Sequence, residues 1–83
     1  MEEVLTHLYN HLVQFPNAEV HAVVKEAARG ANLVVVSYDK AGRREYVRWW
    51  MNESGFYRGK YCDSLDEAMQ LMVQTMITYY GDI

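Results

Sequence analysis

Two four-residue segments of similar composition constrain the fold of this chain more than any other feature. Asp39-Lys40-Ala41-Gly42 and Asn52-Glu53-Ser54-Gly55 both begin with Asp or Asn and end with Gly. This pattern is typical of a type I turn followed by a glycine in the left-handed region, which closes a three-residue β-hairpin loop. We therefore expect three antiparallel strands, at about residues 32–38, 44–51 and 56–61.

The two turns also predict which residues share a face of the sheet, because side chains alternate along a strand. If Asp39 faces Arg43 and Asn52 faces Phe56, one face is apolar and the other is aromatic and basic. The predicted apolar face comprises Leu33, Val35, Val47, Trp49, Met51, Tyr57 and Tyr61. The predicted aromatic and basic face comprises Val34, Val36, Tyr38, Arg44, Tyr46, Arg48, Trp50, Phe56, Arg58 and Lys60. Trp49 should then be buried under the last helix of the chain, and its neighbour Trp50 should be more exposed.

Helices are predicted before and after the strands in the sequence. Residues 4–15 carry apolar side chains at three- and four-residue steps, and Pro16 would end that helix. Ser64 and Glu67 form a capping box, in which each side chain bonds the other residue's backbone amide at the start of a last helix. We expect its apolar stripe to cover the apolar sheet face, with Leu71 alone on the polar side. The stripe consists of Leu65, Ala68, Met69, Met72, Val73, Met76, Ile77 and Tyr80.

The segment at residues 18–29 is open to two interpretations. Asn17 could cap a second helix that ends at Gly30, or the run from Val20 to Val24 could be an edge strand. With either choice, 83 residues of which 51% are hydrophobic predict one small α+β domain, spanning residues 1–83. Its centre would be a three-stranded antiparallel meander, with the last helix on one face and one or two N-terminal helices alongside.

The net charge of -3 is unevenly distributed along the chain. Residues 31–61 hold six Lys and Arg against three Asp and Glu, whereas residues 62–83 hold four acidic side chains and no Lys or Arg. The sheet is therefore basic and the last helix acidic. The sequence has a single cysteine, no basic-then-apolar leader and no apolar run near the roughly 18 residues of a membrane span, so we expect a cytoplasmic protein that does not enter membranes.

Catalytic and metal-binding patterns are weak in this sequence. Glu3, His7 and His11 have the one-turn spacing of helical metal ligands, but no credible fourth ligand accompanies them. Cys62 has carboxylates rather than histidines nearby, which should not activate a thiol. We expect neither enzymatic activity nor a cofactor, metal or small-molecule substrate.

The aromatic and basic face is the candidate site, through Arg44, Tyr46, Arg48, Trp50, Phe56, Arg58 and Lys60. Three interpretations stay open: partial cover by an N-terminal helix or internal packing, contact with a protein partner or a second copy, and nucleic-acid binding. Trp, Tyr and Arg dominate protein interfaces, whereas aromatics beside cations also bind single-stranded nucleic acids. Because the net charge is mildly negative, we expect a small non-catalytic protein-interaction module, with a nucleic-acid-binding accessory protein as the alternative.

Two family resemblances accompany these patterns. Residues 55–61 followed by Ser64-Leu65-Asp66-Glu67-Ala68 resemble the last strand and helix of HicB-type antitoxins and of the arm-binding domains of tyrosine integrases, where Ser or Thr caps a helix before two acidic residues and Ala. The leading helices differ from both families, so the resemblance implies no functional residue here. The predicted helix-strand-strand-strand-helix order also resembles the double-stranded RNA-binding fold. That fold binds through lysines at the start of its last helix, where this chain has acidic residues, which disfavours double-stranded RNA.

Overall fold

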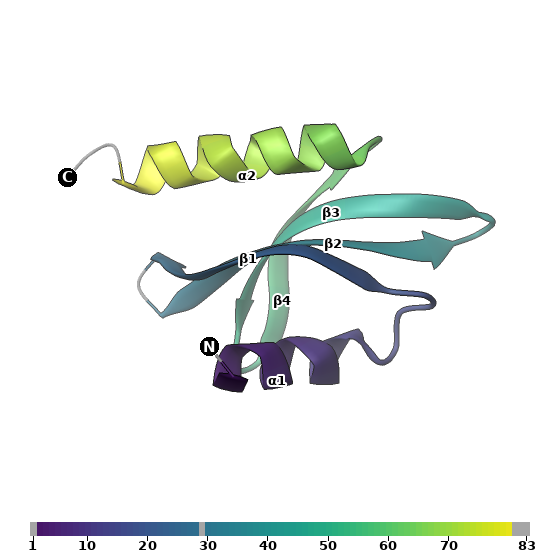
Figure 1. The fold of residues 1–83 in the computed structure, drawn as a ribbon, viewed down its shortest axis with the longest axis horizontal. Coiled ribbons are helices and arrows are strands. Elements are labelled where there is room, and N and C mark those ends of the chain that lie inside the picture. Colours follow the sequence, from purple (N-terminus) through teal and green to yellow (C-terminus); the bar gives the residue numbers. More distant parts are fainter. Residues whose placement is uncertain (1, 29, 81–83) are drawn as a thin grey trace.

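The computed structural model describes residues 2–28 and 30–80, and shows a four-stranded antiparallel sheet with one helix on each face (Figure 1). The elements in chain order are α1 (Glu2–Leu12), β1 (Glu19–Ala28), β2 (Ala31–Lys40), β3 (Arg43–Asn52), β4 (Gly55–Cys62) and α2 (Leu65–Tyr80). Neighbouring strands in sequence are neighbours in the sheet, so β1 and β4 form its two edges. The predicted α+β class is confirmed, but the sheet has four strands instead of three.

The additional strand, β1 (Glu19–Ala28), lies in the segment for which two interpretations were open: the helix interpretation is wrong and the edge-strand interpretation is confirmed. β1 pairs antiparallel with β2. The valines of β1 are β-branched, and such residues favour strands over helices. A bulge near the end of β1 places Glu26 at a φ of 50°, and the Glu26 amide donates a hydrogen bond to Asn32 Oδ1 (2.9 Å). Gly30 lies in the β1–β2 connection with a φ of 70° and does not end a helix.

The β2–β3 hairpin differs by one residue from the predicted register. Lys40 pairs with Arg43, so the loop has two residues, Ala41 and Gly42, at φ values of 52° and 80°. Positive φ at both positions is characteristic of a type I′ turn, whose twist matches that of the flanking strands. A shift of one residue exchanges the faces of β2 relative to β3. Leu33 consequently faces Trp50, where the three-residue loop predicted Trp49.

The β3–β4 hairpin also has a shorter loop than predicted, but a bulge corrects the register. Asn52 pairs with Gly55 instead of Phe56. Farther along, the pairing shifts by one residue around Arg58, which has a φ of 50°. Beyond this bulge Arg48 faces Lys60, the pairing that follows from the predicted register with Asn52 opposite Phe56.

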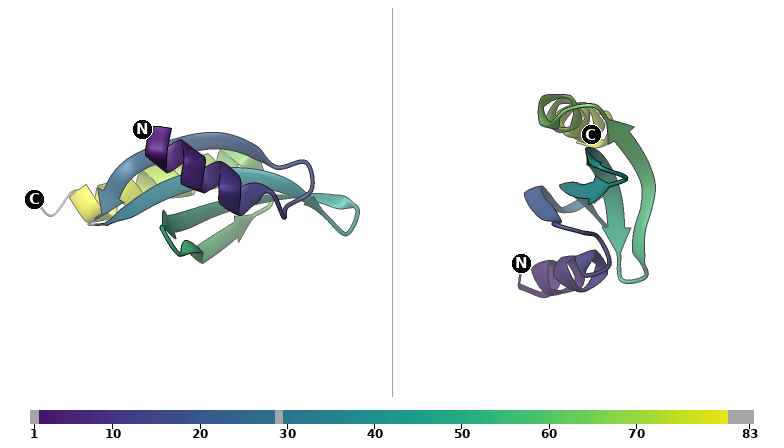
Figure 2. Two further views of the ribbon diagram at one scale, coloured as in Figure 1. Left: turned by 90° about the horizontal axis from the view of Figure 1, so that it is seen from below. Right: turned by 90° about the vertical axis from the view of Figure 1, so that its right-hand side faces the viewer.

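Trp49 and Trp50 are adjacent on β3, so they lie in different cores, one on each side of the sheet. The two helices that cover these cores lie on opposite sides of the strands (Figure 2). Trp49 lies in the core beneath α1, and Trp50 lies in the core beneath α2; each is only 5% exposed. The predictions that α2 covers Trp49 and that Trp50 is exposed are therefore wrong. The α1 core contains Val4, Leu8, Leu12, Val34, Val36, Tyr38, Val47, Trp49 and Met51. The α2 core contains Ala27, Ala31, Leu33, Val35, Trp50, Cys62, Ala68 and Met72.

Helix α2 begins as predicted but presents a different face to the sheet. Ser64 Oγ accepts a hydrogen bond from the Glu67 amide (3.2 Å), while the Glu67 carboxylate accepts from the amide of Asp63 (3.2 Å), one residue before the predicted donor. Leu71, predicted on the polar side, packs against the α2 core. Val73 and Ile77, predicted in the buried stripe, are 53% and 64% exposed. The side chain of Tyr80 lies outside the described part of the structure.

Candidate functional site

The seven residues predicted to form one surface are divided among different environments. Arg48 and Trp50 are buried beneath α2, each 5% exposed. Phe56 packs against the core under α1, on the opposite side of the sheet. Arg44 and Tyr46 are half-buried, and only Arg58 and Lys60 are exposed. The single aromatic and basic face is therefore a wrong prediction, because the shifted first hairpin and the two helices separate its members.

Arg48 forms a buried link between α2 and β4. Its Nη1 donates a hydrogen bond to Thr75 Oγ1 (3.0 Å), and its Nη2 donates to the backbone oxygen of Arg58 (2.9 Å). The guanidinium also lies 5.9 Å from the ring centroid of Trp50, within range of a cation–π contact. These contacts give Arg48 a structural role at the centre of the α2 face.

Arg44 connects the α1–β1 segment to the β2–β3 hairpin. Its guanidinium donates hydrogen bonds to the backbone oxygen of Asn17 (2.7 Å) and to Asp39 (3.0 Å), and it forms an ion pair with Glu19. The Asn17 side-chain amide donates a second bond to Asp39 (2.7 Å). The bond from Asn17, then the bond from Arg44, lower the pKa of the Asp39 carboxyl. This network holds the chain together locally and leaves Arg44 little freedom to bind a ligand.

The exposed part of the predicted site is edge strand β4. We use "β4 surface" for its four exposed side chains, Tyr57, Arg58, Lys60 and Tyr61. The two tyrosines were predicted on the apolar face, yet they are 36% and 59% exposed. β4 pairs with β3 on one side, and no other strand of residues 2–28 and 30–80 pairs with its second edge. Figure 2 (right) shows β4 along one side of the molecule, between the levels of the two helices.

Tyr61 is held in place although more than half of it is exposed. Its ring meets that of Trp49 edge-on, with centroids 6.4 Å apart. Burial raises the pKa of Tyr38 to about 12, and hydrogen bonding and charge from Tyr61 add to that rise. The sequence carried one signal for this arrangement: tyrosine has an apolar ring and a polar tip, so it suits a position that is partly buried and partly wet.

A histidine–serine pair forms on the α2 side of the sheet, which the sequence analysis missed. His21 and Ser37 share a hydrogen bond of 2.7 Å between Nε2 and Oγ. Ser37 pairs with Glu19 in the sheet register, and His21 stands at the bulge between Val20 and Ala22, from which its side chain reaches the Ser37 hydroxyl. Ser37 is only 1% exposed, so a substrate has no access to its hydroxyl. The pair satisfies a buried hydroxyl and does not constitute a nucleophile and its base.

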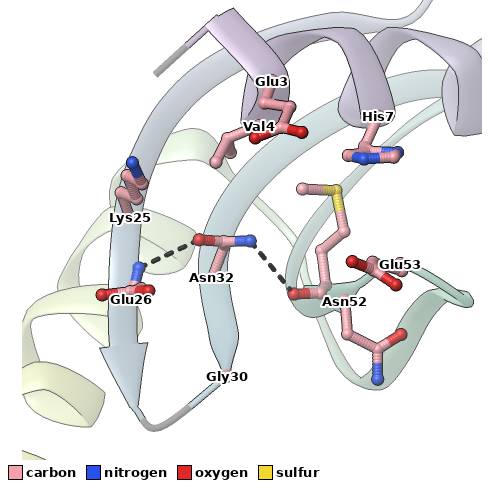
Figure 3. Close-up of a pocket in the computed structure, with 10 residues that line it drawn as sticks. Glu3, Val4, His7, Lys25, Glu26, Gly30, Asn32, Asn52 and Glu53 are labelled. Atoms are coloured by element: carbon pink, nitrogen blue, oxygen red, sulfur yellow. Dashed lines mark hydrogen bonds between the residues drawn. The ribbon is translucent and has the colours of Figure 1, made fainter.

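An open depression lies between the start of α1, the end of β1 and the β3–β4 turn (Figure 3). Its volume is about 340 Å³, and Glu3, His7 and Lys25 contribute to its wall. Asn32, at its centre, already bonds the Glu26 amide and the backbone oxygen of Met51 (3.5 Å). Acidic and basic side chains both line the depression, and the Asn32 side chain is already hydrogen-bonded within the protein. The depression therefore favours neither an anionic nor a cationic ligand.

The remaining candidates from the sequence are a reactive thiol at Cys62, a metal-binding cluster and a membrane-spanning helix. Burial, followed by the negative charge of Glu67, raises the pKa of the Cys62 thiol, which favours its unreactive form. Within the described residues, no group of three or more His, Cys, Asp or Glu side chains is placed to hold a metal ion. Neither helix, over the same residues, is long and apolar enough to cross a membrane.

Comparison of the chain with known proteins gave no match. No protein-family model, curated protein or solved structure matches the chain. The class of protein is therefore defined by the structure alone: a small α+β domain in which two helices enclose a four-stranded antiparallel sheet, with a basic and aromatic strand at one edge.

Proposed function

We propose that this protein is a small, non-catalytic protein-interaction module that binds its partner through the β4 surface. The observation that carries the proposal is an edge strand that combines two exposed tyrosines with two exposed cations. An edge strand offers backbone hydrogen-bonding groups to an extended segment of another protein, and its side chains then determine which segment fits. We place the protein in the cytoplasm, in keeping with its single cysteine.

The charges on β4 favour an acidic segment as the partner. Arg58 and Lys60 lie on the edge strand itself, where each would face a side chain of an added strand. Like charges directly opposite one another are destabilising, so two copies of β4 would pair poorly with each other. The bulge at Arg58 and the charge of Lys60 also protect the edge from indiscriminate pairing. A partner must therefore supply acidic side chains opposite these two positions.

The aromatic side chains would supply the apolar part of the contact. The Tyr61 ring packs edge-on against the buried Trp49, so it loses little conformational freedom when a partner covers it. A rigid, exposed tyrosine is typical of interface positions where truncation costs the most affinity. The same combination of tyrosines and cations would also suit single-stranded nucleic acid, which is the alternative function.

Affinity capture with matched variants tests the proposal. The bait proteins are the wild type, Arg58→Glu/Lys60→Glu on β4, and Lys40→Glu/Arg43→Glu at the tip of the β2–β3 hairpin. All four positions are exposed, so we expect unchanged melting temperatures. A specific protein should be retained from nuclease-treated lysate of the native host by the wild type and the hairpin variant, and lost with the β4 variant.

Two results would contradict the proposal. Equal capture by all three baits would show that β4 is not the contact. Binding of single-stranded RNA or DNA that weakens steeply with added salt and disappears in the β4 variant would instead support the nucleic-acid alternative, because phosphate contacts release counterions.

A further inference from the structure

The indole N–H of Trp49 lies beside the free edge of the sheet, beneath β4. A Cβ built on Gly59 would lie 2.5 Å from Nε1 of Trp49 and 2.6 Å from its Cδ1, so the N–H edge of the ring takes the place of a side chain at position 59. Trp49 belongs to the core under α1, so this edge of the indole lies on the α1 side of β4. A strand added to β4 would therefore pass next to it.

This N–H is a hydrogen-bond donor without an acceptor. Within residues 2–28 and 30–80, no protein atom accepts a hydrogen bond from Trp49, and its Nε1 is not among the polar atoms that the protein covers completely. Yet the whole side chain is only 5% exposed. An indole N–H that is buried to this extent usually has a partner. The missing partner indicates that the acceptor belongs to a bound molecule.

The residues around this donor favour a negatively charged acceptor. The pairing of β3 with β4 shifts so that both Arg58 and Gly59 lie opposite Trp49. Arg58 and Lys60, directly before and after the glycine, are exposed. Over the described part of the chain, neither side chain forms a salt bridge. Hydrogen bonds to a charged acceptor are stronger than those between neutral groups, so an anion gains most from this position.

We propose that the Trp49 N–H donates a hydrogen bond to a carboxylate of the acidic segment that pairs with β4. This inference rests on the proposed function and adds a position at which β4 selects its partner. One side chain of an added strand would lie opposite Gly59 on the α1 side, where the glycine leaves the indole edge uncovered. An Asp or Glu there would accept the N–H bond beside the charges of Arg58 and Lys60. An apolar side chain would bury the donor without an acceptor, which weakens binding.

NMR of the nitrogen-labelled full chain tests the proposal, because its two tryptophans give two indole signals. Trp50→Phe assigns them. The probe is a blocked peptide with the sequence Thr-Glu-Val-Asp-Val-Glu-Thr. During titration with this peptide, the Trp49 indole proton should move downfield together with the backbone amides of β4. The Trp50 indole signal should stay in place, since that ring lies in the core under α2. The Arg58→Glu/Lys60→Glu variant should show none of these shifts.

A variant without the N–H isolates its contribution. In Trp49→3-benzothienylalanine, sulfur replaces the N–H in a ring of nearly the same shape. The peptide should bind this variant about tenfold more weakly than the wild type, as expected for one hydrogen bond to a charged group. The same replacement at Trp50 is the matched control and should leave the affinity unchanged. Melting temperatures of both variants show whether the fold is kept.

The other outcomes separate this inference from the proposed function. Shifts of the β4 amides with an unmoved Trp49 indole, or equal affinity in the benzothienyl variant, overturn the inference and leave β4 as the contact. Unmoved β4 amides up to about 5 mM peptide, the limit of weak binding, overturn the inference and count against the proposed function as well. A Trp49 shift with single-stranded oligothymidylate but not with the peptide would assign the donor to phosphate and contradict the carboxylate.

Discussion

The indole of Trp49 occupies the space that a side chain at position 59 would need. A Cβ built on Gly59 would lie 2.5 Å from Nε1 and 2.6 Å from Cδ1 of Trp49, closer than carbon and these atoms can approach. The glycine therefore lets β4 lie directly against the tryptophan. Trp49 is in turn stacked on Phe56, with ring centroids 4.3 Å apart, so this contact anchors β4 to the α1 core.

We predict that Gly59→Ala destabilises the protein by about 1–3 kcal/mol, the usual cost of overpacking a core. Urea unfolding followed by circular dichroism measures the change. The matched test is Gly59→Ala combined with Trp49→Leu, in which the added methyl group no longer meets an indole. The alanine should cost less in that background than in the wild type. An equal cost in both backgrounds would show that the strain does not come from Trp49.

The two tryptophans should contribute comparably to stability, although they lie in different cores. Because both are 5% exposed, we predict that Trp49→Ala and Trp50→Ala each reduce the free energy of unfolding by about 3–5 kcal/mol. Chemical denaturation of the two variants beside the wild type provides the comparison. A loss below about 1 kcal/mol for Trp50→Ala, the range typical of surface substitutions, would mean that α2 does not cover it.

The parts of the fold that the sequence predicted correctly have strong local signals. Ser64 and Glu67 marked the start of α2 because capping depends on residues close in sequence. The pairing of Arg48 with Lys60 was also correct, because the shorter loop at Asn52 and the bulge at Arg58 compensate each other. The bulge itself could not be predicted, because arginine rarely adopts a positive φ.

The wrong predictions of turn and sheet face arose where the same residues are compatible with two local backbone conformations. The β2–β3 turn places Ala41 at a φ of 52°, and alanine gives no warning of that conformation. That single difference moved Trp50 from the predicted aromatic and basic face into the α2 core, and Arg48 lies buried on the same side of the sheet. Among the residues of the candidate site predicted from sequence, Arg58 and Lys60 are exposed. The exposure of Tyr57 and Tyr61 was missed because alternation predicts the face on which a side chain lies, but not how far a helix covers that face.

The buried Arg48–Thr75 hydrogen bond should contribute to stability across the interface of β3 and α2. We predict that Thr75→Val, which keeps the shape but removes the acceptor, costs about 1 kcal/mol. Arg48→Met removes the guanidinium and also leaves the backbone oxygen of Arg58 without its donor, so it should cost more, about 1–3 kcal/mol.

A double-mutant cycle isolates this contact. The combined Arg48→Met/Thr75→Val variant should be less destabilised than the sum of the two single changes, since each removes the same bond. Strict additivity in urea unfolding would argue against a direct interaction between these side chains.

Alkaline pH should destabilise the protein through Tyr38. Burial, the hydrogen bond with Tyr61, the charge of Tyr61 when ionised and that of Glu45 together raise the pKa of Tyr38 to about 12. In the unfolded chain the pKa of tyrosine is about 10. Raising the pH therefore ionises the unfolded state first. The stabilisation that Tyr38 provides is complete below about pH 10, and it is lost as the pH rises towards about 12.

The Tyr38→Phe variant lacks the ionisable hydroxyl and provides the test. The free energy of unfolding of the wild type relative to Tyr38→Phe should fall steadily from about pH 10 upward, whereas a constant difference would contradict the raised pKa. Tyr61→Phe removes the hydrogen-bond partner and its ionisable group, so it should move the ionisation of Tyr38 to lower pH. The absorbance of tyrosinate, recorded for wild type and Tyr61→Phe under native conditions, measures that shift directly.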